Sequence, residues 1–104
     1  MAAKHFSCRF SNEAEKDLEE IYDFTADKFG IEQAIIYLEG FDNVFEGLCS
    51  NPKLGRERNE VTNGLRSISY KSHTVFYRVV QDYIRIVRVL YGSRDIVRFL
   101  PPQA

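Results

Sequence analysis

The apolar positions of this chain change their spacing twice, from every second residue to helical spacing and back to every second residue. Near the start, Phe6, Cys8 and Phe10 alternate with polar neighbours. A period of two is typical of a strand with one buried side, so we predict a half-buried strand over Lys4–Phe10.

Two amphipathic helices are predicted after this strand. Ser11-Asn12 offers an N-cap, and Asn12 with Glu15 resembles a capping box. The apolar stripes comprise Ala14, Leu18, Ile21, Thr25 and Phe29 in the first helix, and Ala34, Leu38, Phe41, Phe45 and Leu48 in the second. Gly30 separates the stripes, and Asn51-Pro52 ends the second. Helices joined at one glycine must fold back as an antiparallel hairpin, whose outer acidic face we expect to be solvated.

Three more strands are predicted after a polar stretch, Pro52–Gly64, that we interpret as a loop. They span Leu65–Tyr70, Thr74–Val80 and Tyr83–Tyr91, with hairpin turns at Lys71-Ser72 and Gln81-Asp82. The order is β-α-α-β-β-β. We therefore expect an α+β fold in one domain over residues 1–104, with an antiparallel sheet packed against an N-terminal helical hairpin.

Both faces of the last two strands carry apolar residues, although one helical hairpin can cover only one face. In the last strand, one face holds Ile84, Ile86, Arg88 and Leu90, and the other holds Tyr83, Arg85, Val87, Val89 and Tyr91. A sheet with one solvated face should alternate cleanly between apolar and polar residues. We therefore predict that a second polypeptide covers this face, with acidic and apolar side chains that match Arg78, Arg85 or Arg88. The tail from Arg94 to Pro101 is too short to cover all of it.

Charge is divided unevenly between the two halves of the chain. Residues 1–60 hold seven basic and thirteen acidic residues, a net charge of −6, whereas residues 61–104 hold seven basic and two acidic residues, a net charge of +5. Such a split predicts that the strands of the second half present a surface to an acidic partner. The alternative is that Arg66 and Arg78 pair with Glu57, Glu60 or Asp95 and fix the loop to the sheet.

Several classes of protein are excluded by what the sequence lacks. No apolar stretch is long enough to span a membrane, and the first residues do not resemble a signal peptide, so we expect a cytoplasmic protein. Cys8 and Cys49 are interpreted as small buried residues with reduced thiols. No residue spacing is typical of a metal site and no glycine pattern is typical of a phosphate loop, so we expect no metal and no cofactor.

Two motifs in the second half carry a family resemblance. Gly-Arg-x-Arg opens the run Gly55–Arg78, which also holds Gly-Leu-Arg at Gly64–Arg66, and Arg-Val-Leu-x-Gly-x-Arg-Asp spans Arg88–Asp95. With the helical segments in the same order upstream, the chain resembles the ParE toxins of the RelE/ParE toxin–antitoxin superfamily. It departs from many relatives at Tyr91, where they often carry His.

The resemblance implies a toxin that poisons DNA gyrase by binding, with no catalytic residues of its own and no sequence-specific binding of nucleic acid. It also implies neutralisation by a ParD-like antitoxin whose C-terminal segment folds onto the toxin. We assign antitoxin binding to Arg66, Arg78, Arg85 and Arg88, and target binding to Tyr91, Arg94 and Arg98. Phe99 and Leu100 are expected to anchor the C-terminal segment that carries the last two arginines.

Two alternatives remain open. A RelE-like, ribosome-dependent mRNA endonuclease would need cations at a phosphate and an acid or base, for which the candidates are Arg56, Arg58, Arg66, Arg78 and Arg88 with His73 or Tyr91. The net charge of −1 disfavours such an enzyme, because phosphate contacts supply most of the affinity for RNA. We expect His73 to be a hydrogen-bonded structural residue. The second alternative is an inactive toxin-like protein that only holds antitoxin.

Overall fold

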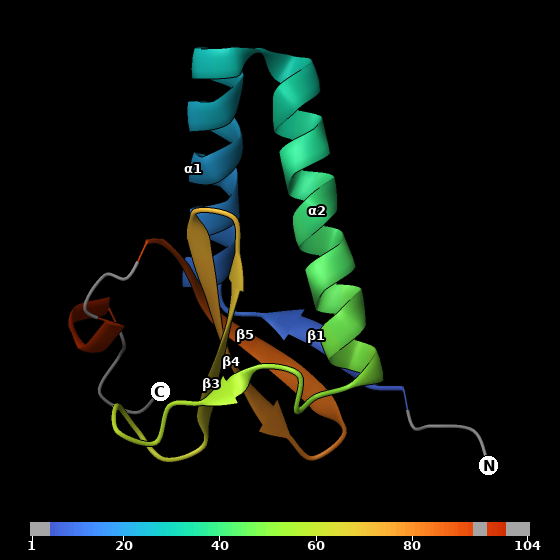
Figure 1. The fold of residues 1–104 in the computed structure, drawn as a ribbon, viewed down its shortest axis with the longest axis vertical. Coiled ribbons are helices and arrows are strands. Elements are labelled where there is room, and N and C mark those ends of the chain that lie inside the picture. Colours follow the sequence, from blue (N-terminus) through green and yellow to red (C-terminus); the bar gives the residue numbers. More distant parts are fainter. Residues whose placement is uncertain (1–4, 93–95, 100–104) are drawn as a thin grey trace.

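The computed structural model describes residues 5–92 and 96–99. A helical hairpin stands on one face of a five-stranded sheet (Figure 1). The elements are β1 (Ser7–Phe10), α1 (Asn12–Phe29), α2 (Ile31–Ser50), β2 (Arg56–Glu57), β3 (Leu65–Tyr70), β4 (His73–Val80), β5 (Tyr83–Tyr91) and the 3₁₀ turn η1 (Ile96–Phe99). The predicted α+β class and the order of the main elements are confirmed.

The sheet is mixed, with the strand order β1-β5-β4-β3-β2. Strands β3, β4 and β5 form the predicted antiparallel meander. Strand β1 instead lies parallel to β5, with Ser7 beside Tyr83 and Phe10 beside Ile86. The predicted loop contains the two-residue strand β2, which pairs with β3. The sheet is therefore antiparallel except at its β1 edge.

The turn between the helices depends on a single glycine. Gly30 has φ +96° and ψ 160°, a backbone conformation that side chains with a Cβ rarely adopt. It ends α1 and begins α2 without further connecting residues. At the other end of α1, the Ser11 hydroxyl accepts a hydrogen bond from the Ala14 N–H at 3.0 Å. Ser11 is therefore the N-cap, and the hairpin is confirmed.

The main core lies between the hairpin and the sheet. Its fully or nearly buried members are Ala14, Ile21, Phe41, Phe45 and Leu48 from the helices, and Val75, Tyr77, Ile84, Ile86 and Val89 from the strands. The predicted helical stripes supply this core except at the tip of the hairpin. There, Phe29 is 68% exposed because both helices extend beyond the sheet (Figure 1). Its place in the buried stripe was a wrong prediction.

A β-bulge changes which residues of β5 face the core. Phe76 pairs with Arg88, but the next residue, Tyr77, pairs with Ile86, so that Val87 is an extra residue in β5. The alternation reverses after the bulge. Val89 therefore joins the core, and Leu90 lies on the opposite face. The prediction that Leu90 shares a face with Ile86 was wrong.

The chain itself covers part of the second face of the sheet. Leu65, Phe76 and Leu90 form a second buried cluster with Ile96 of η1. Val61 and Phe99 pack against this cluster from the loop before β3 and from η1. The apolar residues at this end of the face therefore need no second polypeptide to cover them, which revises the sequence-based expectation.

Candidate functional site: an arginine face on the sheet

The rest of this second face is rich in arginine. On this face, opposite the main core, lie the side chains of β1, β4 and β5 that alternate with the main-core residues and the side chains in register with Ser67 and Phe76. We call their cationic members the arginine face: Arg9, Arg56, Arg58, Arg78, Arg85 and Arg88.

Three of these arginines lie side by side across three neighbouring strands. Arg9 of β1 is in register with Arg85 of β5, and Arg85 is in register with Arg78 of β4. Neighbouring strands are about 4.8 Å apart, so like charges directly opposite one another destabilise the sheet. The Arg9 guanidinium lies over the Tyr83 ring at 4.2 Å. Within the described residues, no acidic side chain forms an ion pair with Arg9 or Arg85.

Arg78 also holds the loop before β3 in place. Its Nη1 donates to the Asn63 carbonyl at 2.8 Å, and its Nη2 donates to the Thr62 hydroxyl at 3.4 Å. The alternative role predicted for Arg78, fixing the loop to the sheet, is therefore present through these polar groups of the loop, and Asp95, one of the acidic partners predicted for it, lies outside the described residues. Arg58 belongs to the same region, with its guanidinium 5.6 Å from the centre of the Phe76 ring.

Arg66 lies on the other face of the sheet. It is in register with the core residue Tyr77, and its Nη1 donates to the Gly55 carbonyl at 2.6 Å. Its Nη2 lies 3.4 Å from a carboxylate oxygen of Glu57. Of the four arginines assigned to antitoxin binding, the structure therefore brings together Arg78, Arg85 and Arg88 but not Arg66.

Arg88 forms a bidentate ion pair with Asp17 of α1. Nε and Nη2 each lie 2.8 Å from a carboxylate oxygen, and the pairing raises the pKa of Arg88. Asp17 also accepts the Val89 N–H at 2.9 Å, so it caps β5 where β1 no longer pairs with it. The Arg88 Nη1 donates to the Phe99 carbonyl at 2.9 Å. Binding of antitoxin by Arg88 stays a prediction.

Sequence reasoning missed the role of Asp17. Asp17 is not part of the apolar stripe predicted for α1, and an acidic residue off that stripe is expected to be solvated, yet it is only 8% exposed. The helical spacing from Ala14 to Asp17 and Ile21 was the available signal, because all three lie on one side of the helix.

His73 and Tyr91 belong to an aromatic cluster on the hairpin side. Tyr37 of α2 shares a hydrogen bond with His73 Nδ1 at 2.8 Å, and the rings of His73 and Tyr91 meet edge to face at 5.5 Å. Burial lowers the pKa of His73, which favours its neutral form. This geometry agrees with the structural role expected for His73. Tyr91 is 60% exposed at the end of β5.

The cations proposed for a nuclease site do not converge on this cluster. All of them except Arg66 lie on the opposite face of the sheet from His73. Arg66 is on the His73 side but four residues along β3 from Tyr70, the partner of His73, or roughly 13 Å. The described residues also hold no group of three His, Cys, Asp or Glu that could bind a metal ion.

Of the C-terminal segment after β5, the structure describes Gly92 and the turn η1. Ile96 is its buried anchor and Phe99 is partly buried, whereas Arg98 is exposed. The anchoring role of Phe99 therefore agrees with the structure, and that of Ile96 was missed. Arg94 and Leu100 lie outside the described residues.

None of the described helices is sufficiently long and apolar to cross a membrane.

Comparison with solved structures supports the fold. The chain superposes with a TM-score of 0.74 on a chain of the chromosomal ParDE toxin–antitoxin system from P. aeruginosa, with 22% identity over 86% of this chain and 99% of the other. It superposes with a TM-score of 0.64 on a chain of the toxin–antitoxin complex RelBE2 from Mycobacterium tuberculosis, with 19% identity over 84% of this chain and 98% of the other.

Comparison of sequences is more specific. Residues 8–96 match the model of the ParE toxin of the type II toxin–antitoxin system parDE. The chain is 41% identical to Toxin ParE1 of Mycobacterium tuberculosis over 88 residues, which are 84% of this chain and 90% of the relative. It is 33% identical to Toxin ParE1 of Caulobacter vibrioides over 87 residues, with the same shares covered. The chain therefore belongs to the ParE toxin family of type II toxin–antitoxin systems.

Proposed function

We propose that this toxin inhibits DNA gyrase in the cytoplasm and that a ParD-like antitoxin neutralises it by binding directly to the arginine face. The observation that carries the antitoxin part is the row of Arg9, Arg85 and Arg78 across adjacent strands. Family membership supports the gyrase part.

The row has a physical cost that a partner would remove. Two like charges directly opposite each other on neighbouring strands destabilise the fold by roughly 0.2–1 kcal/mol, so the concentration of positive charge in this row is unfavourable in the free toxin. Carboxylates of a bound segment would sit against the guanidinium groups with favourable charge and geometry. Tyr83 lies beside Arg9 and supplies apolar surface for the same segment. An acidic and partly apolar antitoxin segment is therefore the partner that fits this surface.

The substitution Arg85→Glu separates binding from folding. It places a negative charge between Arg9 and Arg78, so the free toxin should keep its stability or gain a few tenths of a kcal/mol. The same change should weaken antitoxin binding about 30-fold or more, because a carboxylate would then face the acidic segment. Calorimetric titration with the antitoxin measures the affinity, and urea denaturation measures the stability.

Lys53→Glu is the matched control, since Lys53 is an exposed cation outside the arginine face. It should change the affinity by less than about threefold. An Arg85→Glu toxin that binds antitoxin as tightly as the Lys53→Glu toxin would refute the docking surface. It would leave the family assignment untouched.

We further propose that Tyr91, Arg94 and Arg98 contact the target. Tyr91 is the last residue of β5 and Arg98 lies in η1, and both side chains are exposed. Arg98→Glu should reduce inhibition of gyrase-driven supercoiling while antitoxin affinity changes little. Equal losses of both activities would instead place Arg98 at the antitoxin.

The proposed mechanism involves binding and no nucleolytic site. His73→Gln should therefore leave growth inhibition largely intact in a variant that folds. Tyr91→Phe should do the same, because phenylalanine keeps the exposed ring with which Tyr91 would contact the target. This expectation rests on the separation of His73 from the arginine face by the thickness of the sheet. Loss of toxicity in a folded Tyr91→Phe variant, together with ribosome-dependent cleavage of mRNA by the parent protein, would favour the endonuclease.

A further inference from the structure

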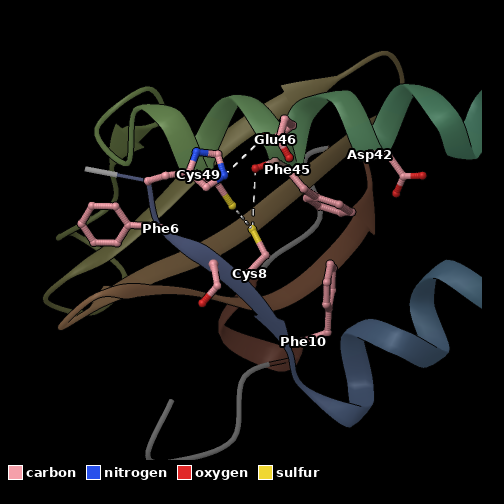
Figure 2. Close-up of a pocket in the computed structure, with 9 residues that line it drawn as sticks. Phe6, Cys8, Phe10, Asp42, Phe45, Glu46 and Cys49 are labelled. Atoms are coloured by element: carbon pink, nitrogen blue, oxygen red, sulfur yellow. Dashed lines mark hydrogen bonds and ion pairs between the residues drawn. The ribbon is translucent and has the colours of Figure 1, made fainter. Parts of the chain in front are cut away.

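Two free cysteines lie against each other between β1 and the last turn of α2. The Sγ atoms of Cys8 and Cys49 are 2.9 Å apart (Figure 2). The residues are 41 positions apart in the sequence, and the segment between them contains α1 and all but the end of α2. Their proximity is therefore a product of the tertiary fold.

The backbone around the two thiols is fixed by hydrogen bonds. The Phe6 N–H donates to the Cys49 carbonyl at 2.9 Å, which ties β1 to the end of α2. The Cys8 thiol lies 3.6 Å from the Phe45 carbonyl and points toward the helix. A disulfide has a sulfur–sulfur distance of about 2.05 Å, so the sulfurs need to approach by only about 0.9 Å.

A small oxidant has a route to Cys8. The two cysteines line a pocket of about 500 Å³ together with Phe6, Phe10 and Phe45, and Figure 2 shows Phe10 and Phe45 on one side of the sulfurs and the Phe6 ring pointing away on the other. Cys8 is partly exposed, whereas Cys49 is buried. Oxidation would therefore begin at Cys8.

We propose that Cys8 and Cys49 are an oxidative modification site, at which a peroxide converts the dithiol into an intramolecular disulfide. The Cys8 thiol gives up its proton, and its sulfur attacks one peroxide oxygen, so that the O–O bond breaks and a sulfenic acid and water form. The Cys49 sulfur then attacks the Cys8 sulfur, which breaks the S–O bond and releases a second water. Two thiols are oxidised and one peroxide is reduced to two waters.

The surroundings set the pH dependence of this step. Burial and the neighbouring Cys49 raise the pKa of Cys8 to about 12, and Glu46 adds to the effect. Glu46 also lies 3.3 Å from His5, and Asp42 lines the same pocket, so the charged groups here offer little help to a thiolate. Because only the thiolate attacks peroxide, oxidation should be slow at neutral pH and faster by up to about tenfold per pH unit above it.

The disulfide would tie the edge strand to the hairpin. It closes a loop that contains both helices, and cross-links of long loops stabilise a fold by restricting the unfolded chain. Strand β1 also carries Arg9 of the arginine face, on the side opposite Cys8. Oxidation would therefore fix the edge of the proposed docking surface without placing the sulfurs in it.

The test compares the full chain with Cys8→Ser and Cys49→Ser. Each protein is treated with hydrogen peroxide at pH 7 and pH 9, denatured, alkylated with iodoacetamide and weighed by mass spectrometry. The parent protein should lose two hydrogens and both alkylation sites, more quickly at pH 9. Its melting temperature should rise by about 5 °C or more, and dithiothreitol should reverse the change. Each serine variant should show neither the intramolecular product nor the higher melting temperature.

Two results would overturn the proposal. One is a parent protein that keeps both alkylatable thiols after oxidation or gains only oxygen atoms. The other is a disulfide that forms only between molecules or that lowers the melting temperature, because the folded pair would then be unsuited to the bond. The reduced serine variants, melted beside the reduced parent, show whether the substitutions alone disturb the fold.

Discussion

Replacing Asp17 with alanine should be among the most damaging single changes to the folded toxin. The Asp17 carboxylate accepts two hydrogen bonds from Arg88 and one from the Val89 N–H, all between 2.8 and 2.9 Å. Only 9% of the Asp17 side chain and 16% of the Arg88 side chain are exposed. Asp17→Ala would leave a nearly buried guanidinium without its counterion and a buried N–H without its acceptor.

The expected loss follows from these contacts. Removing one partner of a buried ion pair costs about 3–5 kcal/mol, and the remaining exposure of Arg88 and its bond to the Phe99 carbonyl place this site at the lower end. We therefore expect a loss of about 3 kcal/mol in the free energy of unfolding. A domain of this size has roughly 5–15 kcal/mol in total, so the melting temperature should fall by about 12 °C or more.

Urea denaturation of four proteins isolates the pair from its surroundings. They are the parent protein, Asp17→Ala, Arg88→Met and the double variant. If the pair acts as a unit, the double variant should be more stable than the sum of the two single losses predicts, by about 1–3 kcal/mol. A loss below about 1 kcal/mol for Asp17→Ala would refute the account, since such a value is typical of an exposed ion pair.

Three further changes test other parts of the fold. Burial lowers the pKa of His73 below its ordinary value of 6.5, so the unfolded chain binds the proton more readily. The free energy of unfolding should therefore fall as the pH drops from about 7 to 5. His73→Gln should remove the contribution of His73 to this fall, which urea denaturation at several pH values measures. Gly30→Ala should lower the free energy of unfolding by about 1–3 kcal/mol, because Gly30 has a φ of +96°. The control Gly47→Ala, within a helix, should be neutral or stabilising, and equal melting temperatures of the two variants would contradict this reasoning. Tyr77→Phe should cost about 2 kcal/mol, because its buried hydroxyl donates to the Pro52 carbonyl and accepts the Gly55 N–H, both at 2.8 Å; a chemical denaturation midpoint equal to that of the parent would rule out this role.

The elements of the fold could be predicted because their patterns are strong and local. The predicted end of the second helix at Asn51-Pro52 and the span Tyr83–Tyr91 agree with α2 and β5. The parallel pairing of β1 could not be predicted, since an alternating pattern shows that a strand has a buried side but does not name its neighbour. The neighbour is set by how the hairpin packs on the sheet.

The bulge at Val87 left a signal in the sequence that strict alternation overlooks. Arg85 and Arg88 are three residues apart, an odd spacing that would place them on opposite faces of a regular strand. The extra residue between them restores both to the arginine face. A polar residue at odd spacing within an otherwise apolar strand therefore indicates a bulge as readily as a two-faced sheet.

The site was partly visible in the sequence. Arg78, Arg85 and Arg88 were singled out because they interrupt apolar strands, and the structure places them on one face. Arg9 was missed because it belongs to the acidic half of the chain, and only the parallel register of β1 brings it beside Arg85. The partner of Arg88 was missed for the same reason, and the contact between Cys8 and Cys49 was not expected, since both contacts join distant parts of the chain.

Inhibition of purified gyrase tests the central claim most directly. Supercoiling of relaxed plasmid is followed with the toxin alone, with the toxin and a ParD-like antitoxin, and with the Arg85→Glu toxin and the same antitoxin. The account predicts that the toxin stops supercoiling, that antitoxin restores it, and that restoration fails for Arg85→Glu at the same antitoxin concentration. Undiminished supercoiling with the folded toxin would contradict the proposed target, and ribosome-dependent mRNA cleavage by the same preparation would replace it with the endonuclease.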